Sequence, residues 1–416
     1  MHIIQTPLFD FEAFIAETGK DRLTMVLEAL PAEKLIIALE NEHQTGRKGY
    51  SVRGMWSAFI AGVLFDCQSV ADVARLLKGN KDVRLICGFA KDNLPGQDAL
   101  ERFLKKLVQH DRLLDECFAS LVETLRQKLP GFGDKLAVDA TDIAAYSNGH
   151  RLHPSDPDAK WGVKEAKNGP EKSPASKGKG RELYRWFGYK LHLCVDALYE
   201  LPIAFVVTPA NEADTTQLKP LLRKAALDQP ERKPEAVIAD KGYDSQENCQ
   251  AIFQDYHAAP IIPLIQQPSW ESADICNAKG TPTCACGLNM VYWGRDGNYL
   301  KYRCPDAVGK TKCRSRFKCA PPPYGYVLKL AVMKEDPRRH VPVPHETKKW
   351  DRLYRMRSAV ERINSRIKDL LGLRRITVRG IAKVTVRSAL SLLVMLAAAV
   401  SMVQRHRFKE MRTLVN

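Results

Sequence analysis

The sequence lacks the segments typical of secreted and membrane-spanning proteins. Its first residues, MHIIQTPLFDFEAFIAETG, contain no basic region followed by an apolar one, so we expect no signal peptide. The most apolar run, SALSLLVMLAAAVSMV at 388–403, is shorter than the ~20 residues that cross a bilayer, and Arg387 and Arg405 flank it. We therefore expect a buried core helix there, in a protein of the reducing cytoplasm.

Acidic residues are also scarce relative to basic ones. There are 48 Asp and Glu against 64 Lys and Arg, which gives a net charge of +16. Residues 341–416 alone contain 17 basic and 5 acidic residues and so hold +12 of that charge. Basic charge gathered on one segment indicates a polyanionic partner, with nucleic acid the first candidate. A hydrophobic fraction of 45% excludes a disordered chain.

The chain shows no internal repeats, and its patterns divide it into four parts. Apolar residues at three- and four-residue spacing predict a helical domain over 1–130, which is either a domain that binds DNA ends or a plain helical bundle. Strand and helix patterns over 131–265 predict the first part of an α/β core, with a mobile Lys-, Gly-, Pro- and Ser-rich loop at 150–183. We expect an insertion at 266–345, and helices that complete the core at 346–416.

The second part indicates an α/β fold with a mixed sheet. KLAVDATDIAAY, GYKLHLCVDA and PIAFVVTPA read as three consecutive strands. A helix (ADTTQLKPLLRKAAL), a strand (EAVIAD), a helix (SQENCQAIFQDY) and a strand (APIIPLI) follow. This order matches an RNase H-like sheet with flanking helices.

Three carboxylates are candidates for metal ligands. Asp139 lies inside an apolar strand, where an unpaired charge is costly. Asp240 ends the strand AVIAD, and strand ends are where ligands bind in open α/β sheets. Glu361 is an acidic residue in a basic helix. Asp142 is out of phase with Asp139, so we interpret it as structural, and we expect Asp244 to cap the helix that follows it.

The basic helix predicted over 354–371, YRMRSAVERINSRIKDLL, presents two faces. At about 100° per residue, Tyr354, Arg357, Glu361 and Lys368 fall within about 60° of one another. An apolar stripe that includes Val360 lies to one side. We expect Glu361 to bind metal, with Arg357 and Lys368 holding phosphates on either side.

These motifs carry a resemblance to a known family. The spacing Y-x2-R-x3-E-x6-K (Tyr354, Arg357, Glu361, Lys368) resembles the signature of a large group of bacterial insertion-sequence DDE transposases. VDATDI and ADKGYDS are similar to that group's two aspartate strands, with Lys241 where many relatives have arginine. GYKLHLCVDA, TPANEADTTQL and the helical segment SVRGMWSAFIAGVLFDCQSVADVARLL resemble further blocks, so the likeness covers about 50–400. PGQDALERF departs from a more usual Ser/Thr-rich stretch.

The resemblance implies a function and a set of partners. Such an enzyme binds terminal inverted repeats, frees 3′-hydroxyls by hydrolysis and joins them to target DNA by transesterification. It implies two Mg²⁺ (or Mn²⁺) ions on Asp139, Asp240 and Glu361, and DNA contacts by Tyr354, Arg357, Lys368 and Lys241. It also implies a synaptic dimer or larger assembly associated with the bacterial nucleoid. The alternatives are an RNase H-like nuclease that only cleaves and a catalytically silent DNA-binding regulator.

The insertion contains cysteines and aromatic residues of two possible roles. Cys284, Cys286, Cys304 and Cys313 fit either a structural zinc ribbon or unligated thiols in a small β-insertion. Cys276 and Cys319 are substitute ligands for that zinc. The aromatic rings of the segment either stack on a DNA base or form its core; they are Trp270, Tyr292, Trp293 and Tyr302.

Overall fold

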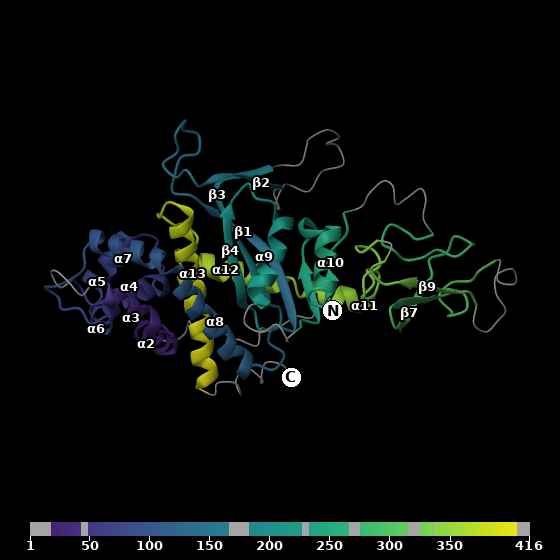
Figure 1. Ribbon diagram of the computed structural model, residues 1–416, viewed down its shortest axis with the longest axis horizontal. Helices are drawn as coiled ribbons and strands as arrows, with labels where there is room; N and C mark the ends of the chain where they lie inside the picture. The colour runs from purple at the N-terminus through teal and green to yellow at the C-terminus, as the bar shows by residue number, and fades with distance from the viewer. Residues whose placement is uncertain are drawn as a thin grey trace. The chain divides into compact units, whose positions relative to one another are not determined.

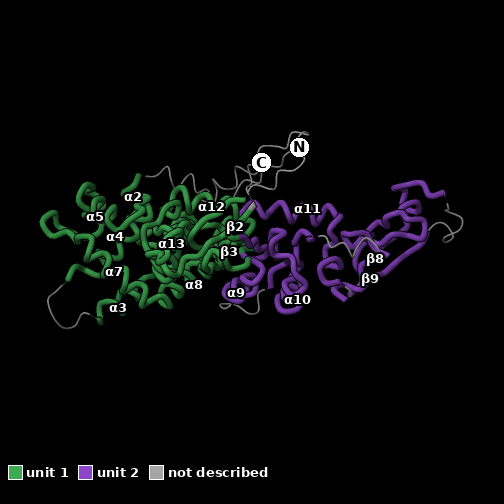
Figure 2. Tube along the Cα trace, turned by 90° about the horizontal axis from the view of Figure 1, so that it is seen from above, with its two compact units in different colours: residues 1–132, 140–213, 360–416 green, residues 133–139, 214–359 purple. Residues whose placement is uncertain are grey.

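The computed structural model describes residues 18–42, 49–165, 183–226, 233–265, 275–314, 325–334 and 336–405. Figure 1 shows the helices and strands of the chain, which divides into two compact units (Figure 2). Unit 1 comprises residues 1–132, 140–213 and 360–416, and unit 2 comprises residues 133–139 and 214–359. The unit boundary falls inside β1 (Lys135–Ala144) and at the start of α12 (Ser358–Asp369), so each of these elements belongs to both units.

Unit 1 begins with the helices expected from the apolar periodicity. They are α2 (Gly19–Ala29), α3 (Glu33–Asn41), α4 (Val52–Leu64), α5 (Val70–Gly79), α6 (Lys81–Ile86), α7 (Gln97–Gln109) and α8 (Asp111–Lys128). Local signals fix several of the helix ends. Ser69 and Asp72, for example, form a reciprocal capping box at the start of α5.

The central helix of unit 1 is α13 (Ile381–Gln404), which packs against α2, α4, α7, α8 and β4 (Leu201–Pro209). In the part of the chain that the structure describes, it is the one helix long and apolar enough to span a membrane, and its most apolar window is 94% buried inside the protein. A helix that is apolar on all sides needs such an environment. The prediction of a buried core helix at 388–403 is confirmed, since every residue from Ser388 to Val403 is buried.

The strands of unit 1 are antiparallel. β2 (Lys160–Glu165) pairs with β3 (Leu183–Asp196), and β3 pairs with β4. Here the prediction of a loop over 150–183 is wrong in part, because residues 160–165 form β2. The alternation in KWGVKE was masked by the surrounding Lys, Gly, Pro and Ser; residues 166–182 lie outside the described residues. Gly162 makes the pairing possible, because a Cβ at this position would lie 2.4 Å from the Trp186 ring.

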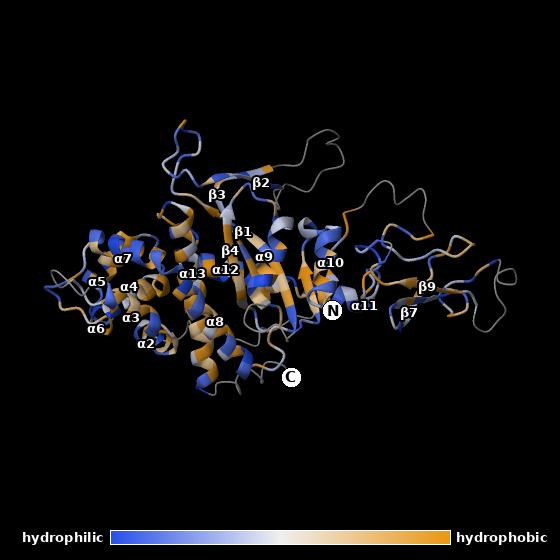
Figure 3. Cartoon of the chain, viewed as in Figure 1, coloured by the Kyte–Doolittle hydropathy of each residue, from blue (hydrophilic) through white to orange (hydrophobic). Residues whose placement is uncertain are grey.

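The strands of unit 2 are parallel. The first residues of β1 pair with β5 (Ala236–Ala239), and β5 pairs with β6 (Ala259–Ile261). Two helices, α9 (Asp214–Ala226) and α10 (Gln246–Gln254), alternate with these strands as the sequence predicts. Along the pairings the strand order is β2-β3-β1-β5-β6, with β4 on β3, which confirms the prediction of a mixed sheet. Figure 3 shows hydrophobic residues concentrated along these strands.

The insertion in unit 2 forms a separate three-stranded sheet of β7 (Val291–Asp296), β8 (Tyr299–Arg303) and β9 (Val327–Ala331). Its small core contains Cys284, Met290, Leu300, Tyr302 and Val332. The helix α11 (Lys348–Arg355) follows it.

The continuous helix predicted over 354–371 is wrong. α11 ends at Arg355, Met356 and Arg357 form a turn, and α12 starts at Ser358. The Met356 N–H bonds to the carbonyl groups of Leu353 and Tyr354, which tightens the last turn of α11 and stops it. The side chains of Tyr354 and Glu361 therefore do not share one helix face.

Candidate active site

Asp139 and Asp240 occupy equivalent positions on neighbouring parallel strands. In the register of β1 and β5, Val138 pairs with Ala239, so Asp139 and Asp240 are the next residue on each strand. Paired strands lie about 4.8 Å apart, which places the two carboxylates side by side. Both residues are partly buried. The apolar residues before each aspartate are buried strand residues; Asp139 lies within β1, and Asp240 directly follows β5.

The backbone after Asp240 orients its side chain. The Oδ1 atom of Asp240 accepts a hydrogen bond of 2.8 Å from the N–H of Gly242, at the start of the short 3-10 helix η1 (Lys241–Tyr243). Lys241 is exposed directly beside this carboxylate. A Cβ at position 242 would lie 3.0 Å from Asp240 Oδ1, so glycine suits this close approach.

Arg357 lies against the first aspartate. Its Nη1 atom is 3.4 Å from Asp139 Oδ2, and both side chains are mostly shielded from solvent. The guanidinium lies 5.9 Å from the ring centre of Tyr354, and that ring stacks on Trp350 at 4.9 Å. The turn between α11 and α12 thus directs Arg357 to the carboxylate, while Tyr354 supports the guanidinium.

Glu361 lies in the first turn of α12, in the part of that helix that belongs to unit 1. The structure brings Asp139 and Asp240 together within unit 2, whereas Glu361 is in the other unit. The side chain of Glu361 is partly buried.

A buried glutamate holds α12 in unit 1. Glu200, in the turn between β3 and β4, is 1% exposed. Its carboxylate accepts a 2.6 Å hydrogen bond from Arg362 Nε and lies 2.8 Å from Arg366 Nη2. Because Arg362 and Arg366 are four residues apart, they share one side of α12 and bind the same anchor. The sequence analysis missed Glu200, since nothing in the turn LYEL identifies its partners.

Lys368 is part of a second charge cluster in unit 1. Asp142 Oδ1 lies 2.5 Å from Lys164 Nζ and 3.4 Å from Lys368 Nζ. Burial alone would raise the pKa of Asp142, but the hydrogen bond from Lys164 and the charges of both lysines hold that pKa below its usual value. Burial also lowers the pKa of Lys368, against the attraction of Asp142. Asp142 is thus an ion-pair partner of Lys368. This contact is consistent with the interpretation of Asp142 as a structural residue.

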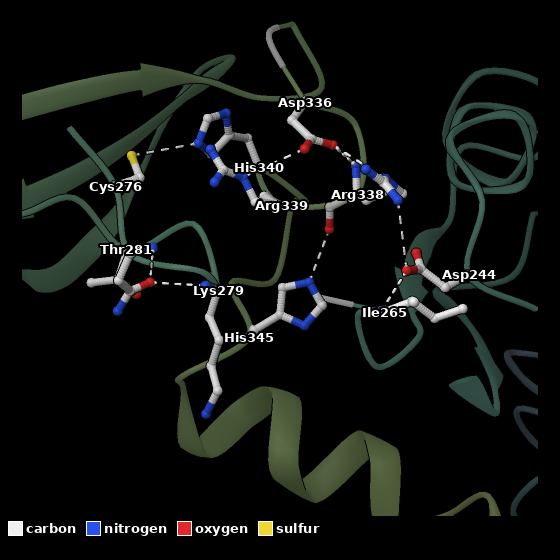
Figure 4. A network of polar contacts seen from close by, with 11 residues as sticks. Asp244, Ile265, Cys276, Lys279, Thr281, Asp336, Arg338, Arg339, His340 and His345 are labelled. Atoms are coloured by element: carbon white, nitrogen blue, oxygen red, sulfur yellow. Dashed lines mark hydrogen bonds and ion pairs between the residues drawn. The ribbon is translucent and has the colours of Figure 1, made fainter. Parts of the chain in front are cut away.

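Asp244 does not cap α10, so that prediction is wrong. The cap is Ser245, whose side chain accepts a hydrogen bond from Asn248 N–H. Asp244 is buried and accepts a 2.7 Å hydrogen bond from the N–H of Ile265 (Figure 4). It also lies 3.9 Å from Arg338. Asp244 therefore connects the loop after Asp240 with the segment before α11.

The structure does not support zinc on the cysteines of the insertion. Among the described residues, no three His, Cys, Asp or Glu side chains form a group that could hold a metal ion. Cys284 is instead packed in the insertion core. Of the substitutes, the sulfur of Cys276 lies 3.7 Å from His340 Nε2, and Cys319 lies outside the described residues.

The aromatic residues of the insertion have different environments. Tyr302 is 1% exposed and belongs to the insertion core. Tyr292 packs edge-on against Tyr302 at 5.6 Å, and Trp293 is 53% exposed with Arg303 at 4.6 Å from its ring. Trp270 lies outside the described residues.

Comparison with known proteins decides the family. The model of the transposase DDE domain matches residues 130–397, which is more than half of the chain. The chain belongs to the DDE transposase family. The resemblance read from the sequence motifs is thereby confirmed.

A curated relative agrees with this assignment over a shorter stretch. A protein of Burkholderia cepacia, named as transposase for insertion sequence element IS402, is 36% identical over 80 residues. This match covers 18% of the chain and 37% of that relative. The match to a solved structure, the piggyBac transposase synaptic complex with hairpin DNA, covers 97% of this chain and 80% of the solved chain. The sequence identity is 10% and the TM-score is 0.39.

The aspartate pair of this DDE domain suits a divalent cation. Mg²⁺ prefers carboxylate oxygens, and it commonly takes only one or two of them together with water and phosphate oxygens. Asp139 and Asp240 offer two such ligands from adjacent positions on neighbouring strands. The donor set present in unit 2 therefore fits the metal that the family implies.

Proposed function

We propose that this chain is an insertion-sequence transposase. It would bind the terminal inverted repeats, hydrolyse the DNA at the element ends and join the freed 3′-hydroxyls to target DNA. The observation that carries this proposal is the adjacent pair Asp139 and Asp240 within a transposase DDE domain. In the joining step the 3′-oxygen forms a bond to a target phosphorus while the bond from that phosphorus to the target 3′-oxygen breaks, and the proton moves to the leaving oxygen.

Each residue of the site has a distinct role in this proposal. Asp139, Asp240 and Glu361 would hold two Mg²⁺ or Mn²⁺ ions, which when bound supply activation of the attacking oxygen and stabilise the leaving one. Arg357 fixes the orientation of the Asp139 carboxylate. Lys241 is exposed next to Asp240, where it can contact a DNA phosphate. Lys368 forms an ion pair with Asp142 and offers a second positive charge to the phosphate backbone of the DNA.

The DNA partner is supported by the charge of the chain. The net charge of +16 favours a polyanion, and the family acts on DNA. We propose that the helices before β1 contact the element ends. Pairing of two ends would need at least two copies of the chain.

A strand-transfer assay tests the proposal. Wild-type protein, paired element ends and a target plasmid are combined with Mg²⁺, and cleaved and joined products are resolved on a gel. We expect both products from wild type and from the exposed control variant Asp92→Asn, and neither from Asp240→Asn. Cleavage without joining would identify a nuclease, and end binding without either product would identify a silent regulator.

A further inference from the structure

A large cavity in unit 2 lies at the amino ends of the parallel strands, away from Asp139 and Asp240. Its volume is about 620 Å³, and its lining includes Lys135, Ala236 and Ala259. These are the first residues of the parallel strands β1, β5 and β6. Asp240 follows the last residue of β5. The length of β5, at about 3.3 Å per residue, therefore separates the cavity from the carboxylates. The cavity is therefore distinct from the candidate active site.

The charge of the cavity favours an anion. Four cationic side chains line it, namely Lys135, Arg295, Lys349 and Arg352. The carboxylate in the lining is Glu235, which lies 3.2 Å from Lys135 Nζ and balances that lysine. Three cations remain on the rim. Arg295 is held in place, because its Nε donates a 2.7 Å hydrogen bond to the carbonyl group of Gly297.

The remaining lining favours a flat apolar group beside that anion. Phe253 of α10 and Tyr292 of β7 both line the cavity, and both pack against the insertion core. Tyr292 is fixed by its edge-on contact with the buried Tyr302. A volume of this size suits a ligand of several hundred Å³, such as one nucleotide.

The wall of the cavity is rigid. Pro342, Val343 and Pro344 form this wall, and His345 directly follows them. Figure 4 shows His345 beside the backbone of Arg338, whose carbonyl group is 2.9 Å from His345 Nε2. Thr347 Oγ1 donates a 2.7 Å hydrogen bond to the carbonyl group of Pro344. A wall held in this way keeps the cavity open before a ligand arrives.

We propose that this cavity binds a nucleotide, with its phosphate on Arg295, Lys349 and Arg352 and its base against Tyr292 or Phe253. Arginine suits phosphate because its planar donors match the phosphate oxygens. Aromatic rings stack on any base, so the site would accept nucleotides with little sequence preference. The ligand is either a free mononucleotide or one unit of a nucleic-acid strand, since both present the same chemistry.

The site is tested by binding rather than by catalysis. Full-length protein is titrated into a 5′-phosphorylated, 3′-fluorescein-labelled hexathymidine with EDTA present, and the anisotropy is measured at several salt concentrations. Arg352→Ala and Lys349→Ala should each weaken binding at least about fivefold and reduce the salt slope by about 0.7. Lys348→Ala is the matched control, because this exposed lysine precedes Lys349 on the same helix and is outside the lining. It should change the affinity by less than twofold.

A second variant separates stacking from charge. Tyr292→Leu should weaken binding about fivefold or more without changing the salt slope, while Tyr292→Phe should bind like wild type. Photo-crosslinking of a 5-iodouracil oligonucleotide should label peptides that contain Tyr292 or Phe253. Competition by thymidine monophosphate at micromolar concentration would identify a free nucleotide as the ligand, and competition by unlabelled hexamer alone would identify a strand.

Three results would overturn the proposal. They are equal losses in Lys348→Ala and Arg352→Ala, crosslinks that map elsewhere, and tight binding of an acidic peptide with the same variant dependence while the oligonucleotide does not bind. An absence of cleavage and joining by the wild-type protein, together with hexamer binding that depends on Arg352, Lys349 and Tyr292 as described, would contradict the proposed function and leave this site standing.

Discussion

At the scale of single residues, the site depends on how each charge is held. Asp139 and Asp240 present like charges on neighbouring strands, and Arg357 provides a positive charge at 3.4 Å from the first of them. Like charges in close proximity repel, so a fixed cation or a bound metal ion stabilises the pair. The spacing of motifs in the sequence predicted the two aspartates. It did not predict the contact between Arg357 and Asp139, because these residues are 218 positions apart.

Arg357→Ala should slow DNA cleavage by roughly 10- to 100-fold, which corresponds to the loss of a charged hydrogen bond of about 1.5–3 kcal/mol. Single-turnover cleavage of pre-bound ends is the measurement. Arg355→Ala, an exposed position two residues earlier, is the control and should cleave within twofold of wild type. Unchanged cleavage by Arg357→Ala would show that Asp139 does not need this partner.

Asp142→Asn should destabilise the protein by roughly 1–2 kcal/mol near neutral pH, because Lys164 and Lys368 lose their shared anion. The folded-state pKa of Asp142 is lowered, so its contribution to stability is present above the unfolded value of about 3.9 and is lost as the pH falls through the folded value. Urea unfolding at pH 7, 5 and 3 measures this. A stability difference that grows toward pH 3 would refute the assignment, and Asp92→Asn controls for a change of net charge.

At the scale of elements, α12 is positioned by residues that no local pattern reveals. The helix 354–371 looked continuous in the sequence because its charged and apolar residues follow one helical period. The structure breaks it at Met356 and Arg357, and it anchors α12 through Glu200. The core strands and helices whose ranges were predicted individually, such as β1, β4 and α10, lie close to those ranges, since their apolar patterns act locally. β2 was missed because its identity depends on pairing with β3.

Glu200→Gln should lower the free energy of unfolding by about 3 kcal/mol, because two arginines would lose a buried carboxylate. It should also slow cleavage under conditions where the variant is folded, since α12 carries Glu361. Denaturant unfolding and single-turnover cleavage measure the two effects. Glu247→Gln, which removes an exposed ion pair, should change stability by less than about 0.5 kcal/mol. Equal effects of the two substitutions would exclude an anchoring role for Glu200.

Gly188→Ala should destabilise the contact between β1 and β3 in unit 1. A Cβ at this position would lie 2.1 Å from the backbone oxygen of Ile143, which cannot move without breaking the strand pairing. We expect a loss of about 2–3 kcal/mol. Gly79→Ala is the control, because a Cβ at position 79 would have no atom within 4 Å and the substitution should stabilise by about 0.4–1 kcal/mol. A neutral Gly188→Ala would show that the strands separate more easily than the structure indicates.

At the scale of the whole molecule, charge and family both support the DNA substrate proposed for this chain. The chain has a net charge of +16, and its DDE domain spans residues 130–397. The composition indicated a polyanionic partner, and the ordered motifs indicated the family. Neither revealed the cavity at the amino ends of the parallel strands, because the residues that line it are far apart in the sequence and come together only in the folded chain.

The central claim is that Asp139 and Asp240 bind the metal ions that support cleavage and joining. The most direct measurement compares Asp139→Cys and Asp240→Cys with wild type in the strand-transfer assay, once with Mg²⁺ and once with Mn²⁺. A thiolate is a softer ligand than a carboxylate and binds Mg²⁺ poorly, whereas Mn²⁺ tolerates it better. We predict a loss of about 100-fold or more in Mg²⁺ for both variants, with substantial recovery in Mn²⁺, and wild-type activity in either metal. Wild-type rates for either cysteine variant in Mg²⁺ would contradict the account.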